Sequence, residues 1–387
     1  MSAKNVVILG STGSIGLSTL DVIRKNPGSF NVLALTAFSD HEQLKSQFHT
    51  YHPRYLGLVD SESCDTLRQN LKDEDVEILT GEEINDVLGL NETDIVVNAV
   101  VGAAGLQFSY ETVHHKKILA LANKESMVVA GPILKKAAAK TGCKIIPIDS
   151  EHSAVFQILE SKRVVDVKNI ILTASGGPFR ELPIEKFNDI TPEQALNHPT
   201  WKMGRKISID SATLANKGLE IIEAVNLFDV PVEKVKVVIH PQSIIHSMVE
   251  FVDSSILAQL SKPDMRMPIT YALFWPERTI SDFGAFDFSK QTSLAFEPPD
   301  MKKFPALKIA YDVANLGGTA PAIFNAANEV AVAAFLDKAI SFVDITRIIE
   351  QTISEIEVIE NPELKDVLQA DSLARQTAER MTGQTAC

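Results

Sequence analysis

The 387-residue sequence contains very little cysteine. Only Cys64, Cys143 and Cys387 occur, and no two of them have the CxxC spacing typical of thiolate metal sites. An odd, scattered set of this kind argues against a disulfide framework and against zinc bound by cysteine. It is the usage expected in a reducing compartment, so the composition predicts a cytoplasmic protein.

Basic residues and long apolar segments are also scarce. Lys and Arg number 37 against 50 Asp and Glu, a formal charge of −13, whereas general nucleic-acid binding needs a basic face. The longest apolar run, 95–106, is shorter than the roughly 20 residues of a membrane span, and residues 1–5 show no apolar core of a signal peptide. We therefore expect neither a nucleic-acid partner nor a membrane partner, while a small anionic ligand remains possible because a few local cations suffice for it.

The N-terminal segment has the pattern of a strand, a glycine-rich turn and a helix. Val6–Leu9 is a continuous apolar run, Gly10–Gly16 reads GSTGSIG, and an apolar-periodic segment follows. In this setting backbone N–H groups and a helix N-terminus bind a pyrophosphate. The spacing is GxxGxxG rather than GxGxxG, so a tight turn without a ligand is the alternative to the dinucleotide site that we predict.

The end of the second predicted strand, 31–36, is where such a domain distinguishes NAD from NADP. Ser39 could donate to a 2′-phosphate, but Asp40 would repel one if it pointed inward, and no arginine lies beside them. These residues alone leave the choice open. Further strands are predicted at 55–59, 76–79, 94–100, 118–122 and 144–146, with helical segments between them, which indicates a Rossmann-like parallel sheet.

Polar residues follow several of these strands. Asn123, Lys124 and Glu125 come after 118–122, where open α/β sheets bind ligands, although a solvated surface position is an equally good interpretation of Lys124. Asp149 and Glu151 follow 144–146. Because side chains two apart on an extended backbone point the same way, these carboxylates are expected to converge on one cation, with Ser150 available for a polar ligand.

The second half contains two further candidate segments. A predicted strand, Val167–Ala174, ends in Ser175-Gly176-Gly177, which is either an anion-binding turn or an ordinary loop. The loop 197–205 contains His198, Trp201 and Met203 and is either a lid or a loop docked on the core. A further strand is predicted at Val235–Ile239, and we interpret His240 and His246, which follow it, as structural.

The segment 208–224 contains the start of a predicted helix. We expect this helix to begin at Asp210 or Ser211, as its N-cap, and to end at about Leu227. Asn216, Lys217 and Glu220 share one face of it. A solvated Lys–Glu pair is the usual outcome of such spacing, but the neighbouring isoleucines predict burial, which favours a site for a phosphorylated, metal-chelated ligand.

Several segments together resemble one family, 1-deoxy-D-xylulose 5-phosphate reductoisomerase, the NADPH enzymes of the non-mevalonate isoprenoid route. They span most of the chain in one order and read GSTGSIG (Gly10–Gly16), VGAAGL (Val101–Leu106), LANKES (Leu121–Ser126), DSEH (Asp149–His152), SGGPFRE (Ser175–Glu181), MGRKIS (Met203–Ser208), DSATLANKGLE (Asp210–Glu220), IHPQS (Ile239–Ser243) and NAANE (Asn325–Glu329).

The resemblance implies a fold with an N-terminal Rossmann-like NADPH-binding domain (1–149) and a central α/β catalytic domain (150–277) with a mobile lid at about 197–205. The sequence that follows is rich in Gly, Phe and Pro without a period at 278–299, which indicates a linker. It has a helical pattern beyond Met301, which predicts a C-terminal α-helical domain (300–387). The resemblance also implies a homodimer and one Mg²⁺ or Mn²⁺ ion per chain. The residues implied at the cofactor are Thr12, Gly13, Ser14, Ile15, Asn123, Glu125 and Gly204. Those implied at the metal are Asp149, Glu151 and Glu220, which with Lys124 form the catalytic set. Those implied at a phosphorylated sugar are Lys124, Ser150, Glu151, Ser175, His198, Ser211, Asn216, Lys217 and Glu220.

The implied reaction rearranges and reduces 1-deoxy-D-xylulose 5-phosphate to 2-C-methyl-D-erythritol 4-phosphate. Three carboxylates without a thiolate suit a hard octahedral cation that polarises a ketone. Two rival interpretations are an NAD(P)-dependent sugar- or polyol-phosphate dehydrogenase without rearrangement, and a nucleotide-sensing module without catalysis. Phe38-Ser39-Asp40 departs from the small or basic residues that the family often places there.

Overall fold

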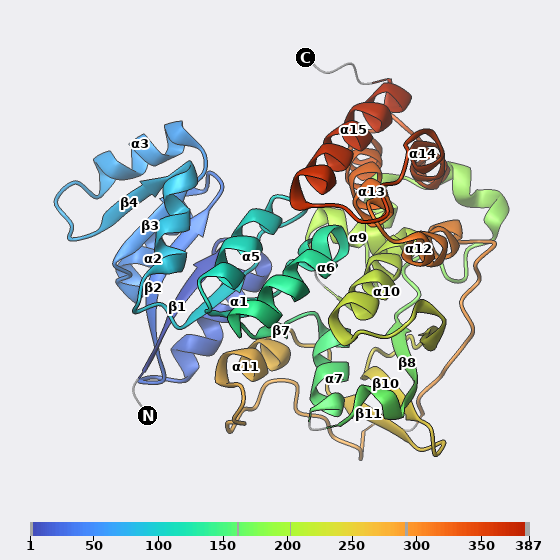
Figure 1. The fold of residues 1–387 in the computed structure, drawn as a ribbon, viewed down its shortest axis with the longest axis horizontal. Helices are drawn as coiled ribbons and strands as arrows, with labels where there is room; N and C mark the ends of the chain where they lie inside the picture. Colours follow the sequence, from blue (N-terminus) through green and yellow to red (C-terminus); the bar gives the residue numbers. More distant parts are fainter. Residues whose placement is uncertain (1–2, 161, 202, 291–292, 384–387) are drawn as a thin grey trace. The chain divides into compact units, whose positions relative to one another are not determined.

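The computed structural model describes residues 3–160, 162–201, 203–290 and 293–383 (Figure 1). The chain divides into two compact units. The first contains residues 1–123, 134–153 and 264–284, and the second contains 124–133, 154–263 and 285–387. Among the described residues, no helix is both long and apolar enough to cross a bilayer.

The first unit is built on a seven-stranded sheet in the order β4-β3-β2-β1-β5-β6-β7, and every neighbouring pair is parallel. Its strands are β1 (Lys4–Leu9), β2 (Phe30–Ala37), β3 (Tyr55–Leu58), β4 (Glu77–Thr80), β5 (Ile95–Asn98), β6 (Ile118–Leu121) and β7 (Ile145–Pro147). Its helices are α1 (Ser14–Lys25), α2 (His41–Tyr51), α3 (Ser61–Asn70), α4 (Asp86–Gly89), α5 (Gly105–His114) and α11 (Arg266–Phe274), with a 3₁₀ turn η1 (Gly81–Asn85).

All seven strands predicted for this sheet are present, with ends that differ by one or two residues. Val6–Leu9 is completely buried, as expected for a central strand of a parallel sheet covered on both faces. The strand order reverses at β1, which lies between β2 and β5. In open α/β sheets ligands bind at such a switch point, beyond the carboxyl ends of the strands. The Rossmann-like prediction is confirmed.

The second unit contains a four-stranded mixed sheet in the order β11-β10-β8-β9. Strands β8 (Val167–Ala174) and β9 (Val235–Ile239) are parallel and were predicted; β10 (Ile245–Phe251) and β11 (Ile256–Leu260) are antiparallel additions that the sequence analysis missed. In β10 the buried positions include His246 and Ser247, so the apolar alternation that would identify a strand is broken.

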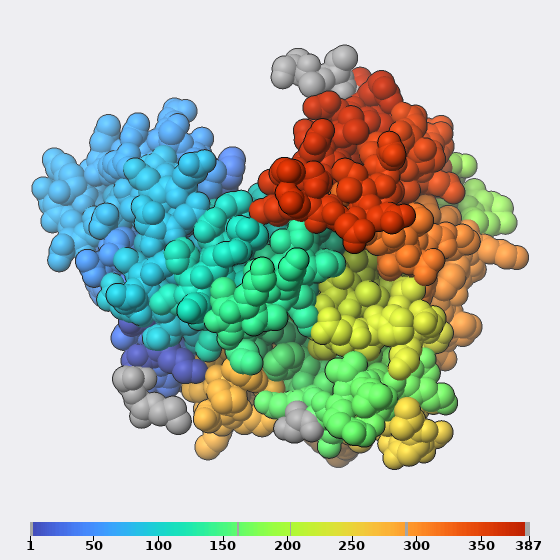
Figure 2. All heavy atoms as spheres, in the orientation of Figure 1, coloured from blue at the N-terminus to red at the C-terminus, as the bar shows by residue number. Residues whose placement is uncertain are grey.

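Most of the second unit is helical. Its helices are α8 (Pro192–Ala195), α9 (Arg205–Thr213), α10 (Ala215–Phe228), α12 (Pro305–Leu316), α13 (Ala320–Leu336), α14 (Phe342–Glu355) and α15 (Leu364–Thr382), with 3₁₀ turns η2 (Val164–Asp166), η3 (Ile184–Asp189) and η4 (Val232–Lys234). The prediction of a C-terminal helical domain beyond Met301 is confirmed for the described residues, in which α15 ends at Thr382. Helix α13 is buried along most of its length, and the atoms of the red C-terminal helices form one closely packed mass (Figure 2).

Two helices continue from one unit into the other. Helix α6 (Lys124–Thr141) starts in the second unit and ends in the first, and it leaves helical geometry at Ala130, two residues before Pro132. A proline inside a helix cannot donate its backbone hydrogen bond, which accounts for a kink there. Helix α7 (Ser150–Leu159) starts in the first unit and continues into the second.

One predicted helix is two helices. The helix expected from Asp210 or Ser211 to about Leu227 is interrupted at Leu214, whose φ of 60° is left-handed. Asp210 and Ser211 therefore lie inside α9, and neither is an N-cap. The prediction was wrong because Asp and Ser are good N-cap residues by type, whereas here Asp210 is a buried helix-interior carboxylate.

Candidate active site

The glycine turn after β1 is shaped for close approach of the backbone. Gly10 has a φ of +77°, and a Cβ there would lie 2.8 Å from the carbonyl oxygen of Ala99. A Cβ on Gly16 would lie 2.4 Å from the carbonyl oxygen of Gly10, so only glycine lets α1 start this close to the turn. The backbone N–H groups of Ser14 and Ile15 lie in the first turn of α1, where no helical acceptor exists, and suit an anion.

Helix α2 supports this turn. Ser11 Oγ donates to Gln47 Oε1 at 2.7 Å, and Gln47 Nε2 donates back to the Ser11 carbonyl at 2.9 Å, with both residues buried. At the start of the same helix, Asp40 is the N-cap and accepts from the Gln43 N–H at 3.0 Å. Asp40, whose carboxylate left the choice between NAD and NADP open, therefore caps α2. Phe38 beside it is 71% exposed.

Asn123 connects the ends of β5 and β6. Its amide Nδ2 donates to the carbonyl oxygens of Val100 (2.7 Å) and Gly102 (2.8 Å). A Cβ on Gly105 would lie 2.5 Å from Asn123 Cγ, so the small-residue turn makes room for this side chain. The predicted cofactor residue therefore also holds the loop after β5 in place, at the switch-point edge of the sheet.

Asp149 and Glu151 lie at the start of α7, in the first unit. One carboxylate oxygen of each is within 4.8 Å of the other, and Ser150 Oγ donates to Glu151 Oε2. The Ser153 N–H donates to the Asp149 carbonyl at 2.7 Å. The extended alternation predicted for these residues is wrong, because Ser150 already belongs to the helix. The positive end of the helix, and not a strand, is what favours two neighbouring carboxylates here.

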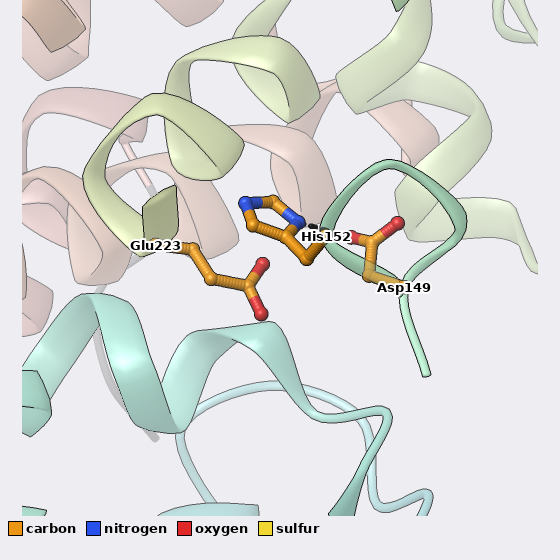
Figure 3. Close-up of side chains that lie close together, drawn as sticks. All are labelled: Asp149, His152 and Glu223. Carbon is orange, nitrogen blue, oxygen red and sulfur yellow. Dashed lines mark ion pairs between the residues drawn. The ribbon is translucent and has the colours of Figure 1, made fainter. Parts of the chain in front are cut away.

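His152 is a neighbour of these carboxylates that the sequence analysis did not assign. Its buried ring has Nδ1 3.9 Å from Asp149 Oδ2, and Figure 3 shows the two side chains together at the start of α7. Glu223, also drawn there, is a buried residue of α10 in the second unit.

In the second unit, Glu220 of α10 is surrounded by donors. Lys124 Nζ lies 3.3 Å from Glu220 Oε1 and donates to Asn216 Oδ1 at 2.8 Å. Asn216 Nδ2 donates to Glu220 Oε1 at 2.5 Å, and Lys217 forms an ion pair with Glu220 Oε2. Both lysines are buried, so neither is the solvated surface lysine of the alternative interpretation. The predicted shared face of α10 is confirmed.

A contact between α6 and α10 positions Lys124. Asn226 Nδ2 donates to the Met127 carbonyl at 2.7 Å, and a Cβ on Gly131 would lie 2.5 Å from that amide nitrogen. These contacts pack the first turns of α6 against α10. Lys124, the first residue of α6, therefore lies close enough to α10 for its ammonium to reach Glu220.

Ser175 and His198 form a polarised pair. His198 Nδ1 accepts from the N–H groups of Thr200 (3.1 Å) and Trp201 (2.9 Å), so the neutral ring carries its proton on Nε2. Nε2 lies 2.9 Å from Ser175 Oγ, which also accepts from the Gly177 N–H at 3.3 Å. With two donors on its oxygen, the Ser175 hydroxyl hydrogen is directed outward, as a phosphate oxygen requires. Burial lowers the pKa of His198 and keeps the ring neutral.

Ser211 lies next to this turn, and Asn216 and Lys217 follow it at the start of α10. A Cβ on Gly177 would lie 2.7 Å from the Ser211 carbonyl oxygen, so the 175–177 turn packs directly on α9. Helix α10 begins at Ala215, which puts the backbone N–H groups of Asn216 and Lys217 at its positive end. The three residues predicted to bind phosphate thus belong to the same unit as Ser175.

The structure also contains a series of connected polar side chains that the sequence analysis did not predict. Lys206 Nζ lies 2.9 Å from Glu125 Oε1 and 3.0 Å from Asp210 Oδ2, and Asn328 Nδ2 donates to Asp210 Oδ1 at 2.8 Å. Burial acts to raise the pKa of Glu125, but the Lys206 charge and hydrogen bond outweigh it and lower that pKa. Burial raises the pKa of Asp210 despite the same lysine. No sequence spacing relates Glu125 to Lys206, because they lie 81 residues apart.

In the described part of the loop 197–205, Thr200 and Trp201 donate to His198, and the Trp201 ring has its centroid 6.3 Å from that of His246 on β10. Gly204 is the N-cap of α9, and Ser208 Oγ donates to its carbonyl at 2.9 Å. Lys202, within this predicted lid, lies outside the described residues. His246 Nε2 lies 2.8 Å from Ser261 Oγ, and His240 Nε2 accepts from the N–H groups of Ile244 and Ile245, which agrees with structural roles.

The donor set fits a hard divalent cation. Asp149 and Glu151 provide carboxylates within 4.8 Å of each other, and Glu220 provides a third. The described thiols, Cys64 and Cys143, are buried elsewhere in the first unit, where Cys143 donates to the Lys117 carbonyl. Oxygen ligands without sulfur are those that Mg²⁺ and Mn²⁺ prefer.

Three family models match successive parts of the chain. They are 1-deoxy-D-xylulose 5-phosphate reductoisomerase at residues 6–131, the 1-deoxy-D-xylulose 5-phosphate reductoisomerase C-terminal domain at 145–228, and the DXP reductoisomerase C-terminal domain at 260–377. Together they cover most of the described residues of both units.

Curated relatives and solved structures agree with these matches. The 1-deoxy-D-xylulose 5-phosphate reductoisomerases of Chlorobaculum tepidum and Thermodesulfovibrio yellowstonii are 51% and 49% identical over 98% of this chain and 100% of theirs. The Zymomonas mobilis enzyme in complex with NADPH matches with a TM-score of 0.91 and 42% identity over 99% of this chain and 100% of that one. A DOX-P reductoisomerase in complex with NADPH, fosmidomycin and magnesium matches with a TM-score of 0.92 and 40% identity over 98% of both chains. The chain therefore belongs to the 1-deoxy-D-xylulose 5-phosphate reductoisomerase family.

Proposed function

We propose that the residues described above carry the reaction of this family. As a member of it, the chain is an NADPH-dependent oxidoreductase that uses a divalent metal and converts 1-deoxy-D-xylulose 5-phosphate to 2-C-methyl-D-erythritol 4-phosphate. The observation that carries the assignment of residues is the buried cluster around Glu220. Two ammonium groups and an amide there converge on one carboxylate, which a dehydrogenase without rearrangement would not need.

The cofactor residues of the proposal are Thr12, Gly13, Ser14, Ile15 and Asn123 in the first unit and Glu125 and Gly204 in the second. Ser14 and Ile15, with Thr12 and Gly13 in the preceding turn, offer N–H groups to the pyrophosphate. The remaining members, Asn123, Glu125 and Gly204, approach the nicotinamide half. This part is supported by the close-approach glycines and by the engagement of Asp40 as a helix cap, which commits one of its carboxylate oxygens to the Gln43 N–H.

The substrate phosphate is bound, in this proposal, by Ser175, Ser211, Asn216 and Lys217, with His198 holding Ser175. The outward hydroxyl of Ser175, the α10 N-terminus and the Lys217 ammonium all favour a dianion. Lys124, Ser150 and Glu151 contact the hydroxyl and carbonyl end of the sugar. A buried ammonium such as Lys124 can hold a substrate oxygen and balance negative charge that develops on it.

The metal ligands of the proposal are Asp149, Glu151 and Glu220. A bound Mg²⁺ or Mn²⁺ ion would polarise the substrate carbonyl and stabilise negative charge on its oxygen. The chain's own contribution is to place two carboxylates at the helix start at Ser150 and one among the cations around Glu220, and to cover the site with the lid at 197–205.

The proposal keeps the predicted division into an NADPH-binding domain (1–149), a catalytic domain (150–277), a linker (278–299) and a C-terminal helical domain (300–387). A homodimer is part of it, and the edge strand β11 supports this, since Ile256 and Leu257 are 52% and 45% exposed there. An apolar sheet edge favours pairing with another strand. A cytoplasmic location is also proposed, and it rests on the buried free thiols of Cys64 and Cys143.

The experiment that tests the function follows NADPH oxidation at about 340 nm with 1-deoxy-D-xylulose 5-phosphate, in Mg²⁺ and again in EDTA, and identifies the product. Metal-dependent oxidation with a branched product is expected. An unbranched product, or oxidation that EDTA does not affect, would instead identify a sugar-phosphate dehydrogenase.

A further inference from the structure

Lys206 is a cation in an unfavourable place. It lies in the first turn of α9, whose N-terminus repels positive charge, and its side chain is only 18% exposed. Removing an ammonium from water costs several kcal/mol unless partners compensate it. Here the compensation comes from Glu125, on α6, and Asp210, one turn along α9, at 2.9 and 3.0 Å.

The two carboxylates differ in what else holds them. Asp210 accepts an amide hydrogen bond from Asn328 on α13, so it is anchored to the helical part of its unit independently of Lys206. Glu125 follows Lys124 directly in the first turn of α6, among the residues that the proposed function assigns to cofactor and substrate. The ion pair with Lys206 therefore joins a structural anchor to a cofactor residue.

The geometry also involves the lid. Lys206 comes two residues after Gly204, where the loop 197–205 ends and α9 begins. With Asp210 fixed by Asn328, and Ser208 bonded to the Gly204 carbonyl, the Lys206 side chain extends from an immobilised helix start toward Glu125. The Glu125 carboxylate is thereby connected, through Lys206, to the point where the loop ends and α9 begins.

We propose that Lys206 is a positioning residue for NADPH, which acts by holding the Glu125 carboxylate in one orientation, so that it accepts a hydrogen bond from a hydroxyl or amide N–H of the cofactor. The inference rests on the proposed function, because it requires that Glu125 contacts NADPH. Buried ion pairs are weak evidence for a role in stability, since apolar replacements are often neutral. A role in orienting a ligand-binding group is what the arrangement of Asp210, Lys206 and Glu125 favours.

The test measures the Kd of NADPH by fluorescence titration without sugar phosphate, and the steady-state constants, for Lys206→Met, Lys206→Arg, Glu125→Gln and the double variant Glu125→Gln/Lys206→Met. Lys206→Met is expected to raise the Kd and the KM of NADPH about tenfold, as loss of a charge-assisted hydrogen bond does, while kcat at saturating NADPH changes less than about threefold. Lys206→Arg restores most of the affinity. The double variant is expected to bind NADPH no more weakly than the weaker single variant, because both substitutions remove the same interaction.

Two further variants separate positioning from folding. Asp210→Asn keeps the Lys206–Glu125 pair and an amide oxygen that can still accept from Lys206, so it is expected to raise the Kd of NADPH far less than Lys206→Met does, even if its Tm falls. If Lys206→Met fails to fold, Lys206→Arg and Glu125→Gln still test the inference. Lys308→Met removes a lysine from an exposed i,i+4 pair with Asp312 at 2.6 Å and controls for loss of charge.

The outcomes distinguish the inference from the function on which it rests. If Glu125→Gln leaves the Kd of NADPH unchanged, the cofactor role proposed for Glu125 is wrong, and the inference is overturned with it. If Glu125→Gln weakens NADPH but Lys206→Met does not, or if Asp210→Asn weakens NADPH as much as Lys206→Met, only the positioning role is overturned.

Discussion

His198 donates from Nε2 to Ser175 Oγ across 2.9 Å, and its Nδ1 accepts from two backbone N–H groups of the lid. The lid conformation and the orientation of a phosphate-binding hydroxyl are therefore set by one imidazole tautomer. His198, 23 residues away in the sequence, thus determines the direction in which the Ser175 hydroxyl can donate.

Ser175→Ala and His198→Gln test this pair. Each is expected to raise the KM for the sugar-phosphate substrate about tenfold or more, the effect of losing one charge-assisted hydrogen bond, and the double variant should be clearly less than additive. Ser255→Ala, in an exposed turn with Asp253, is the matched control. Fully additive single effects would show that His198 does not act through Ser175.

The same pair predicts a pH dependence. Burial lowers the pKa of His198 from its ordinary 6.5, so the folded ring is neutral above about pH 6.5. Below its lowered pKa the ring gains a proton on Nδ1, which then opposes the Thr200 and Trp201 N–H donors, and the KM for substrate should rise. Because the unfolded chain binds this proton first, the His198 contribution to stability is complete above about pH 6.5 and declines as the pH falls toward the lowered pKa.

A comparison of the substrate KM at pH values from about 5.5 to 8, in wild type and His198→Gln, checks this prediction. The variant retains any change due to the substrate phosphate, whose second pKa is about 6. The steeper rise of the wild-type KM in acid should disappear in the variant; parallel profiles would mean that His198 does not titrate in this range.

Glu220→Gln tests the metal and substrate cluster. The substitution removes a proposed metal ligand and leaves Lys124 and Lys217 without their shared carboxylate. Turnover is expected to fall at least about a thousandfold, because electrostatic stabilisation of the reacting oxygen is lost, while the Kd of NADPH changes less than about twofold. Glu355→Gln, from an exposed pair with Arg380, is the control. Retained turnover would contradict the role of Glu220, and lost NADPH binding would indicate a folding defect.

Gly16→Ala tests the close approach of α1 to the turn after β1. A Cβ would lie 2.4 Å from the Gly10 carbonyl oxygen, so the variant should lose about 1–3 kcal/mol of unfolding free energy and bind NADPH more weakly. Gly13→Ala is a matched comparison, since its Cβ would lie 3.4 Å from the same oxygen and its φ is an ordinary −78°. Denaturant unfolding of both variants measures the difference; equal losses would mean that α1 shifts to accommodate the methyl group.

Leu257→Lys tests the proposed homodimer. Lysine on an edge strand opposes pairing with a second copy, because it would bury a charge at the interface. Sedimentation equilibrium should give twice the chain mass for the wild type and a lower mass for the variant at low concentration. The exposed Leu373 of α15 provides the control Leu373→Lys, which should leave the mass unchanged. A wild-type chain that sediments as a monomer would end this part of the proposal.

Much of the site is readable in the sequence because it depends on local rules. The glycines at 10 and 16 indicate close backbone approach, Val6–Leu9 indicates a buried parallel strand, and the spacing of Asn216, Lys217 and Glu220 indicates one helical face. In each case the structure agrees, since neighbours within a few residues determine the geometry. The motif order then identifies the family.

Other features have no local signal. Nothing near Leu214 predicts a left-handed residue that ends α9, and an extended alternation was wrongly expected for Asp149 and Glu151, which a helix start now explains. Strand β10 was missed because His246 and Ser247 are buried there, satisfied by partners that the fold supplies.

The sequence by itself determined the parallel nucleotide-binding sheet, the carboxylates suited to a hard cation and the family. Only the tertiary structure decided that Asp40 is a helix cap, that His198 orients Ser175, and that Lys206 lies between Glu125 and Asp210. The physical reason is the range of the interactions. Periodicity and turn chemistry act between residues close in the chain, whereas the charge, tautomer and orientation of a buried polar group depend on partners that packing brings together from distant positions.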